Sequence, residues 1–323
     1  MDTVASPPAQ RPLLHLALLF ATVATTLATF LVLWSSASLT DAGWDWSRVG
    51  RRQWIESLQF SLSVVAILGS HEMGHWLMAR WHRVETSLPY FIPLPFLGFG
   101  TLGAVIRIRG RIPTRNALVD IGAGGPLAGF AVAVPILFWG YAHAHLAAAL
   151  SIPSGFPAPD SLLGVLAGLL EPAPASGHEV TVFGDSLLML FIQRLTLGPL
   201  PAGTDVVANP FIMAGWFGCL VTVLNLIPIG QLDGGHLAFA NLGGRAVGVG
   251  KVVALGFLGL VLFFHYSWGV WLLVVSLVVG FRHPEVERAE EPLDGRRMAI
   301  CIACLFVFAL CMTPVPLRIV GVP

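Results

Sequence analysis

Charged residues are scarce in this chain of 323 residues. Asp, Glu, Lys and Arg make up 11% of it, about half of their share in soluble domains, and the formal net charge is zero. A nucleic-acid-binding protein needs a basic surplus, so we exclude this class and expect no nucleic acid partner. A disordered chain needs low hydrophobicity, and four cysteines are too few for a secreted disulfide scaffold, so both are excluded. The chain instead contains 55% hydrophobic residues.

Apolar segments long enough to cross a bilayer recur along the whole chain. A transmembrane helix needs about 20 mostly apolar residues. The segments that approach or exceed this length are roughly 13–34, 55–80, 116–141, 209–229, 246–265, 267–282 and 298–317. The sequence therefore predicts an all-α polytopic membrane protein that contacts the lipid bilayer through about six to seven transmembrane helices. The first segment exceeds the apolar region of a secretory signal peptide, so we expect a retained helix.

The basic residues predict how these helices are oriented. A cluster of arginines lies between the second and third apolar segments. Placing this connection in the cytoplasm also places the N-terminus and most other basic residues there, as the positive-inside rule requires. Arginine supplies nearly all of the basic residues, and alanine and glycine are abundant, which is typical of GC-rich bacteria. We therefore expect a multi-pass protein of the bacterial inner membrane with a cytoplasmic N-terminus.

Two connections differ from ordinary loops. Residues 142–208 are rich in proline and acidic residues, and their apolar stretches Leu162–Leu170 and Phe183–Leu197 are compatible with interfacial helices. A lid over a site and an inert linker both fit this extracytoplasmic segment. Residues 88–112 are apolar but broken by prolines and glycines, so they cannot form a regular helix. The alternation in residues 105–109 predicts a short strand or re-entrant hairpin at the cytoplasmic face.

The second apolar segment contains the sequence His71-Glu72-Met73-Gly74-His75. Residues four apart project from one face of a helix, so the two imidazoles can hold one Zn²⁺ while Glu72 reaches a water on the metal. Ionisable side chains within an apolar span are costly and usually mark function. The sequence therefore predicts a metal site inside the second span.

A catalytic zinc needs a third protein ligand, and two candidates follow the fourth apolar segment. Asp233 and His236 both lie in a stretch that proline and glycines interrupt where the helix should leave the membrane. Spacing alone does not choose between them, and Asp233 is equally compatible with a helix cap at a loop.

The two motifs together resemble a known signature. HExxH on one apolar segment, followed far downstream by Asn225-Leu-Ile-Pro228-Ile-Gly-Gln-Leu-Asp233-Gly, resembles the signature of the site-2 protease family of intramembrane zinc metalloproteases. Residues 120–129 resemble the Gly-Pro-x-Ala-Gly segment of this family, and the proline-rich stretch from Pro89 resembles its re-entrant element. Neither a PDZ insertion nor a CBS region is evident, so the chain resembles the compact branch of the family.

The resemblance implies roles for individual residues. His71, His75 and Asp233 would bind one Zn²⁺ per chain, which favours Asp233 over His236. Glu72 would be the general base that activates a zinc-bound water, and Asn225, with Pro228 nearby, would help to hold the substrate backbone.

The function implied is zinc-dependent intramembrane endopeptidase activity. The enzyme would hydrolyse a peptide bond within or near the transmembrane segment of a single-span protein. An anti-sigma factor, a membrane-tethered regulator or a signal-peptide remnant are the substrate classes that the family suggests. A helical substrate must unwind locally, so we expect the edge that contains Val105 and Ile106 to pair with it as an added strand. A hairpin that merely plugs the site is the alternative. The active site would open to the cytoplasm, because its helix ends near Arg80.

The chain then divides into successive regions. These are an N-terminal helix and external loop (1–54), a first catalytic part (55–141), the proline-rich loop (142–208), a second catalytic part (209–245) and C-terminal helices (246–323). The alternative function is a zinc transporter or zinc-sensing membrane protein that uses the same ligands without hydrolysis. Transport would need polar groups on several helices, and a pure binding site has no use for Glu72.

Small and polar residues of the third apolar segment are interpreted structurally. Gly125 and Gly129 form a Gly-x-x-x-Gly pattern, which we attribute to close helix packing rather than to the site. Asn116 and Asp120 lie near the start of the segment, where they could either support the metal ligands or cap the helix, and we favour the cap.

Overall fold

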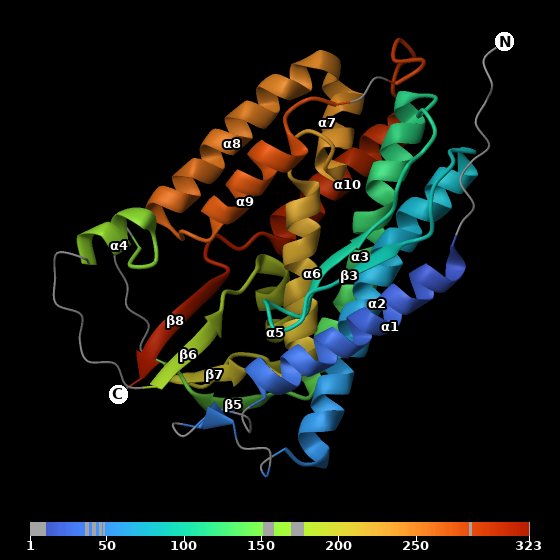
Figure 1. Ribbon diagram of the computed structural model, residues 1–323. Helices are drawn as coiled ribbons and strands as arrows, with labels where there is room; N and C mark the ends of the chain where they lie inside the picture. Colours follow the sequence, from blue (N-terminus) through green and yellow to red (C-terminus); the bar gives the residue numbers. More distant parts are fainter. Residues whose placement is uncertain are drawn as a thin grey trace.

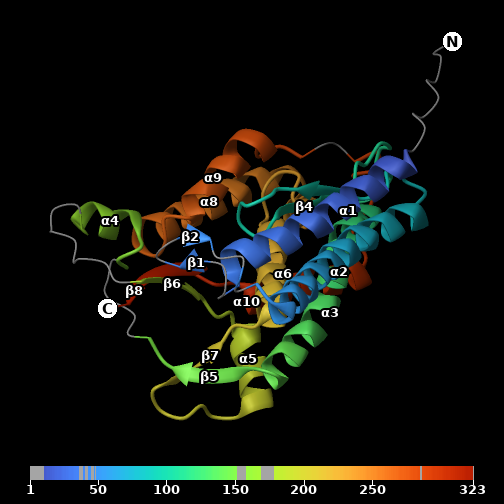
Figure 2. The same cartoon turned by 60° about the horizontal axis from the view of Figure 1, so that its bottom comes forward.

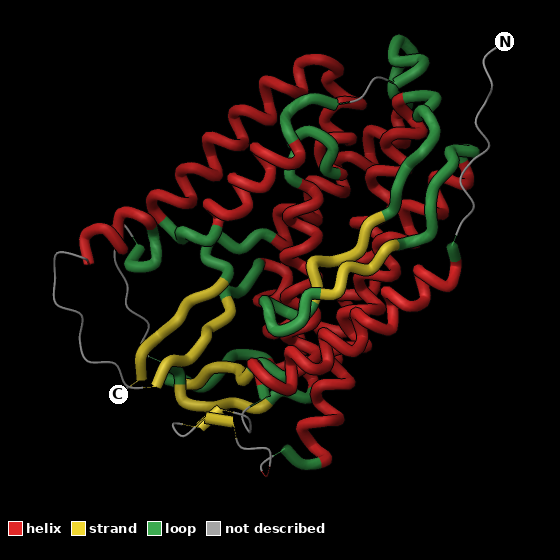
Figure 3. Tube along the Cα trace, viewed as in Figure 1, coloured by secondary structure: helices red, strands yellow, loops and turns green. Residues whose placement is uncertain are grey.

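The computed structural model describes residues 11–35, 39–40, 43–44, 47, 49–150, 158–168, 178–283 and 286–322. Within these residues the fold is a bundle of helices with short two-stranded sheets (Figures 1 and 3). The bundle holds the motif-bearing helices at its centre, so we describe these first.

The N-terminal half supplies the two helices that pack most closely. Helix α1 (Pro12–Thr29) continues into a π-helical turn, η1 (Phe30–Trp34), and is followed by α2 (Arg51–Trp81) and α3 (Arg115–Ala142). Helices α2 and α3 run antiparallel and touch backbone to backbone, because a Cβ at Gly124 would lie 2.8 Å from the carbonyl oxygen of Gly74. Glycine at both positions is what permits this approach.

The cap of α3 differs from the prediction. Thr114 is the N-cap, with extended backbone angles and a side-chain oxygen that accepts a hydrogen bond from the amide of Ala117. Asn116 is the second residue of α3 and Asp120 the sixth, so both lie inside the helix rather than at its cap position, and their interpretation as caps was wrong.

The C-terminal half contains α6 (Pro210–Leu226), α7 (Asp233–Leu242), η3 (Gly243–Arg245), α8 (Ala246–Phe263), α9 (Trp268–Val274), η4 (Val275–Val279) and α10 (Gly295–Cys311). Asn209 caps α6, because its side chain accepts hydrogen bonds from the amides of Phe211 and Ile212. Helix α6 ends at Leu226, two residues before Pro228, since a proline disfavours helical backbone in the residue that precedes it. The chain then turns sharply into α7.

Each of the seven apolar segments predicted to cross the membrane contains a helix. Only some of these helices have the length and hydropathy of a membrane span. Among the described residues, three stretches do so: Pro12–Trp34, Arg115–Ala142 and Asp233–Phe263. Helix α6 is apolar but has 17 residues. Helix α2 has 31 residues, and its polar side chains, including those of the HExxH motif, lower its hydropathy. A helical membrane protein is therefore supported, and six to seven spans remain a prediction.

Three small antiparallel sheets gather at one end of the bundle (Figures 1 and 2). They pair β1 (Leu39–Thr40) with β2 (Gly43–Trp44), β5 (His145–Ala148) with β7 (Thr204–Val207), and β6 (His178–Phe183) with β8 (Leu317–Val322). Two of them contain strands from the proline-rich loop, which also forms α4 (Leu162–Gly168) and α5 (Leu187–Leu197). The two expected helices are present, and the strands beside them were not expected. Residues 169–170 of the first predicted helix lie outside the described residues.

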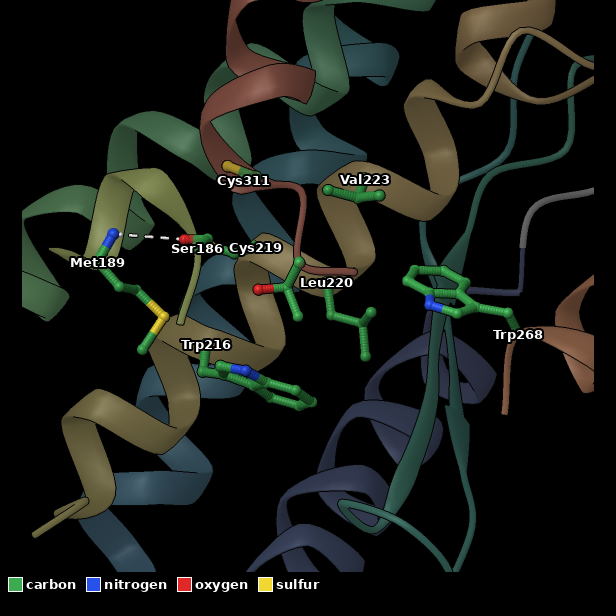
Figure 4. Close-up of a pocket in the computed structure, with 9 residues that line it drawn as sticks. Ser186, Met189, Trp216, Cys219, Leu220, Val223, Trp268 and Cys311 are labelled. Carbon is green, nitrogen blue, oxygen red and sulfur yellow. Dashed lines mark hydrogen bonds between the residues drawn. The ribbon is translucent and has the colours of Figure 1, made fainter. Parts of the chain in front are cut away.

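The interior beside these sheets is tightly packed (Figure 4). Ser186 caps α5 by accepting a hydrogen bond from the amide of Met189, next to Trp216 and Cys219 of α6 and Cys311 of α10. The gap that these side chains leave is about 10 Å³, room for about one water molecule. Cys219 and Cys311 are buried free cysteines that act as packing residues here.

Candidate metal centre and active site

Helix α2 buries the side chains of the HExxH motif in its C-terminal half. His71, Glu72 and His75 are 3%, 6% and 6% exposed. Because the two histidines are four residues apart, they project from one face of α2, and their Nε2 atoms lie 3.1 Å from each other.

Asp233 reaches the same point from the start of α7. Its Oδ2 atom lies 3.4 Å from Nε2 of His71 and 3.3 Å from Nε2 of His75. The turn between α6 and α7 brings it there. Gly230 has a φ of +56°, and a Cβ at Gly234 would collide with the carbonyl oxygen of Leu226. The glycines are therefore needed for the sharp return of the chain toward α2.

The three ligand atoms fit one zinc ion. In a tetrahedral site with ligands at about 2.0–2.1 Å, neighbouring ligand atoms lie about 3.3 Å apart, close to the separations found here. Nδ1 of His75 lies 2.7 Å from the carbonyl oxygen of Ile121 and donates a hydrogen bond to it. This fixes the tautomer in which Nε2 carries a free lone pair. Two imidazoles and one carboxylate are the donors typical of a catalytic zinc site.

Glu72 lies beside these atoms rather than among them. Its Oε1 is 4.0 Å from Nε2 of His71, farther than the Oδ2 of Asp233. The backbone amide of Ile106 is directed at this carboxylate. His71, Glu72 and His75 form a compact donor cluster on their own, with all ligand atoms within 4.8 Å. The shorter contacts favour Asp233 over Glu72 as the third ligand.

His236, the competing donor, makes a different contact. It lies one turn after Asp233 on α7, and its Nδ1 is 2.6 Å from Nε2 of His283. This pair lines the same cavity as the metal centre, but one ring nitrogen of His236 is directed toward His283.

The glycines of α3 lie directly behind the histidines. A Cβ at Gly125 would collide with Nε2 of His75, and one at Gly129 would lie 3.2 Å from Cβ of His71. Their interpretation as packing residues alone was incomplete, because what they pack against is the metal centre. The shared spacing was a usable signal, since on antiparallel helices two glycines four apart can face two histidines four apart.

The remaining predicted residues divide into two groups. Asn225, at the end of α6, places its Nδ2 3.4 Å from Nε2 of His71 and lines the cavity at the metal centre. Val105 and Ile106 also line this cavity. Pro228 lies in the turn after α6 and is not among the lining residues.

The cavity has a volume of about 620 Å³ and extends from the metal centre along one strand edge. Strands β3 (Tyr90–Pro93) and β4 (Thr101–Val105) pair in antiparallel register, with Tyr90 opposite Val105. A hairpin is thus present where one was expected, and it lies beside α1 (Figure 2); its re-entry into the membrane stays a prediction. The regular strand ends at Val105 rather than spanning residues 105–109.

Beyond β4 the pairing continues irregularly and leaves one edge open. The amide of Ser87 bonds the carbonyl of Arg107, and the amide of Arg109 bonds the carbonyl of Glu85. Ile108 between them forms a bridge with Thr86, so the backbone groups of Ile108 point to the opposite edge. The amide of Ile106 points the same way, toward Glu72. The open edge therefore faces the metal centre.

Comparison with known proteins decides the family. The model of peptidase family M50 matches residues 59–264, which include both motifs and the hairpin. The chain belongs to peptidase family M50, the site-2 protease family. The family resemblance predicted from the motifs is thus confirmed.

Plant proteins are among the relatives of this M50 chain. The probable zinc metalloprotease EGY2, chloroplastic, of Oryza sativa subsp. indica is 32% identical over 258 residues, covering 79% of this chain and 42% of the plant protein. The probable zinc metalloprotease EGY1, chloroplastic, of Arabidopsis thaliana is 33% identical over 267 residues, covering 80% and 43%. The M50 chain therefore spans less than half the length of these relatives. No solved structure matches it.

Proposed function

We propose that this M50 chain is a zinc-dependent intramembrane endopeptidase that cleaves within or near the transmembrane segment of a single-span protein. The observation that carries the proposal is the convergence of two imidazoles, a carboxylate and a second, separate carboxylate in one cavity with an open strand edge. Family membership and relatives named zinc metalloproteases support it.

The residues then have distinct roles. His71, His75 and Asp233 hold one Zn²⁺, which when bound lowers the pKa of a water molecule and polarises a carbonyl. Glu72 lies close enough to take a proton from the attacking water and return it to the leaving amine. The side-chain amide of Asn225 lines the same cavity and orients the carbonyl of the substrate peptide.

The substrate binds as an added strand. A peptide in a helix hides its carbonyl carbon, so the cleaved segment must be extended in the cavity. The backbone groups of Ile106 and Ile108, which point to the open edge, are the ones that a peptide can pair with. Because this recognition uses backbone groups, it suits an anti-sigma factor, a membrane-tethered regulator or a signal-peptide remnant equally.

The cavity opens toward the cytoplasm of a bacterial cell. In Figure 1 the end of α2, the start of α3 and the start of α10 lie at one end of the bundle, and the sheets of the proline-rich loop lie at the other. The positive-inside rule supports a cytoplasmic location for the first end, since Arg80, Arg83 and Arg115 lie there. The location in the inner membrane is part of the proposal.

A test measures metal content and cleavage in the same preparations. Wild type, Glu72→Gln and Asp233→Ala would be purified in detergent, assayed for zinc and offered a single-span model substrate. We expect about one zinc and cleavage for wild type, zinc without cleavage for Glu72→Gln, and loss of both for Asp233→Ala.

Glu56→Gln is the matched control. Glu56 lies on the same helix but pairs with Arg52 at the protein surface, so this variant should behave as wild type. If Glu72→Gln cleaves as well as wild type, the assigned base is wrong. If no preparation cleaves while zinc crosses proteoliposomes, the alternative of a zinc transporter or sensor replaces the protease.

A further inference from the structure

A cluster of charged side chains joins α2, α3 and α10 at the end of the bundle where α2 ends and where α3 and α10 begin. The guanidinium of Arg297, in the first turn of α10, binds Asp120 of α3 in a two-pronged contact. The Nε–Oδ1 distance is 3.0 Å and the Nη2–Oδ2 distance is 2.6 Å. The side chain of Asp120 is only 10% exposed, so water screens this pair less than a surface pair.

Asp120 also binds the helix that carries the histidines. Nε2 of His82, the C-cap residue that follows α2, lies 2.8 Å from Oδ2 of Asp120. His82 follows His75 by seven residues, which is about two helical turns, so both lie on the face of α2 directed toward α3. Asp120 thus ties the end of α2 to α3 and to α10.

The residue after Asp120 contacts a predicted metal ligand directly. Ile121 is 1% exposed, and its carbonyl oxygen accepts the hydrogen bond from Nδ1 of His75. The orientation of this imidazole therefore depends on where the backbone of α3 lies relative to α2. The ion pair with Arg297 holds the backbone of α3 at Asp120, the residue directly before Ile121.

We propose that Arg297 and Asp120 are positioning residues for the metal centre. Through them the C-terminal helix α10 holds Ile121 against His75, so that the affinity for metal depends on a residue far from the ligands in sequence. This inference rests on the proposed metal site but not on proteolysis. A surface ion pair that only adds stability would leave the metal affinity unchanged.

The experiment measures metal affinity rather than activity. Wild type, Arg297→Lys, Arg297→Met and Asp120→Asn would be stripped of metal and titrated with Zn²⁺ against a chromophoric chelator. The absorption spectrum of the Co²⁺-loaded protein would report on the coordination. Lysine keeps the charge but cannot make the two-pronged contact, so it tests the geometry with the least risk to folding. We expect each variant to lose zinc affinity by about 10-fold or more. Ten-fold is the lower end of the loss that is typical when a group orienting a metal ligand is removed.

Arg288→Met is the matched control. Arg288 precedes α10 and makes an exposed pair with Glu291, so its removal should leave the metal affinity within twofold of wild type. Thermal unfolding of the metal-free proteins separates positioning from stability. Arg297→Lys with wild-type affinity and an unchanged Co²⁺ spectrum would overturn the proposal. A wild type that binds no metal would overturn the metal centre itself, and a wild type that binds metal without cleaving would overturn only the proteolysis.

Discussion

The metal centre has one side built of glycine and one side built of an open strand edge. Toward α3, glycines at positions 74, 124, 125 and 129 let backbone approach the histidines without intervening side chains. Toward β4, a cavity of about 620 Å³ lies between the ligands and the strand edge. The closed side fixes the ligands, and the open side leaves room for a peptide. We therefore expect substitutions on the two sides to affect different measurements.

The largest effect is expected on the closed side. Gly125→Ala places a methyl group on Nε2 of His75, so the imidazole must leave its position or the helices must separate. Metal affinity should fall by about 100-fold or more, measured by zinc titration of the purified protein.

Two glycines calibrate this prediction. In Gly129→Ala the new Cβ would lie 3.2 Å from Cβ of His71, so the loss of metal affinity should be smaller than for Gly125→Ala. In Gly256→Ala the new Cβ would meet nothing within 4 Å, so the metal affinity should not change. Equal affinities for Gly125→Ala and Gly256→Ala would show that the closed side does not constrain the ligand.

An intermediate effect is expected on the open side. Ile106→Pro removes the backbone N–H that is directed at Glu72 and interrupts the strand edge available to a peptide. Cleavage of a membrane substrate should fall by about 100-fold while zinc content stays at the wild-type level. Ile106→Ala keeps the amide and should retain most of the activity. Undiminished turnover by Ile106→Pro would favour the hairpin as a plug instead of a docking edge.

The smallest effect is expected at the rim of the closed side. Asp294 caps α10, and the backbone amide and guanidinium of Arg297 lower the pKa of its carboxyl. The charged form therefore stabilises the folded state above the unfolded pKa of about 3.9, and this contribution disappears as pH falls through the lower folded pKa. Asp294→Ala should lower the Tm slightly at pH 7, and the difference from wild type should shrink below about pH 4.

Asp294→Asn controls for the cap. Asparagine also serves as an N-cap, so it should recover part of the lost Tm. A difference in Tm that grows toward acid pH would be evidence against the assigned sign.

The parts of the site that depend on local geometry were predictable from the sequence. The spacing of His71 and His75 guarantees a common helix face, whatever surrounds it. Spacing could not decide whether Asp233 or His236 is the third metal ligand, because this depends on the turn after α6 and on how α7 enters the site. The family resemblance favoured Asp233, and the distances agree with it.

The parts that depend on distant pairing were not predictable. Strands β6 and β8 lie more than 130 residues apart in sequence, and nothing in either segment specifies the other. Gly125 and Gly129 share the four-residue spacing of the histidines, but this spacing becomes informative only once α2 and α3 are known to pack against each other. The contact between Asp120 and Arg297 likewise joins residues 177 apart, so it appears only when the fold is known.

The backbone amide of Ile106, which is directed at Glu72, links selectivity to the shape of the substrate backbone. A single amide hydrogen serves one strong acceptor at a time, so a peptide that pairs at Ile106 takes this donor away from the carboxylate. A compact solute or a side chain that enters the cavity makes no such exchange. An extended peptide main chain is therefore what releases the Glu72 carboxylate from the amide of Ile106, whatever side chains the peptide carries.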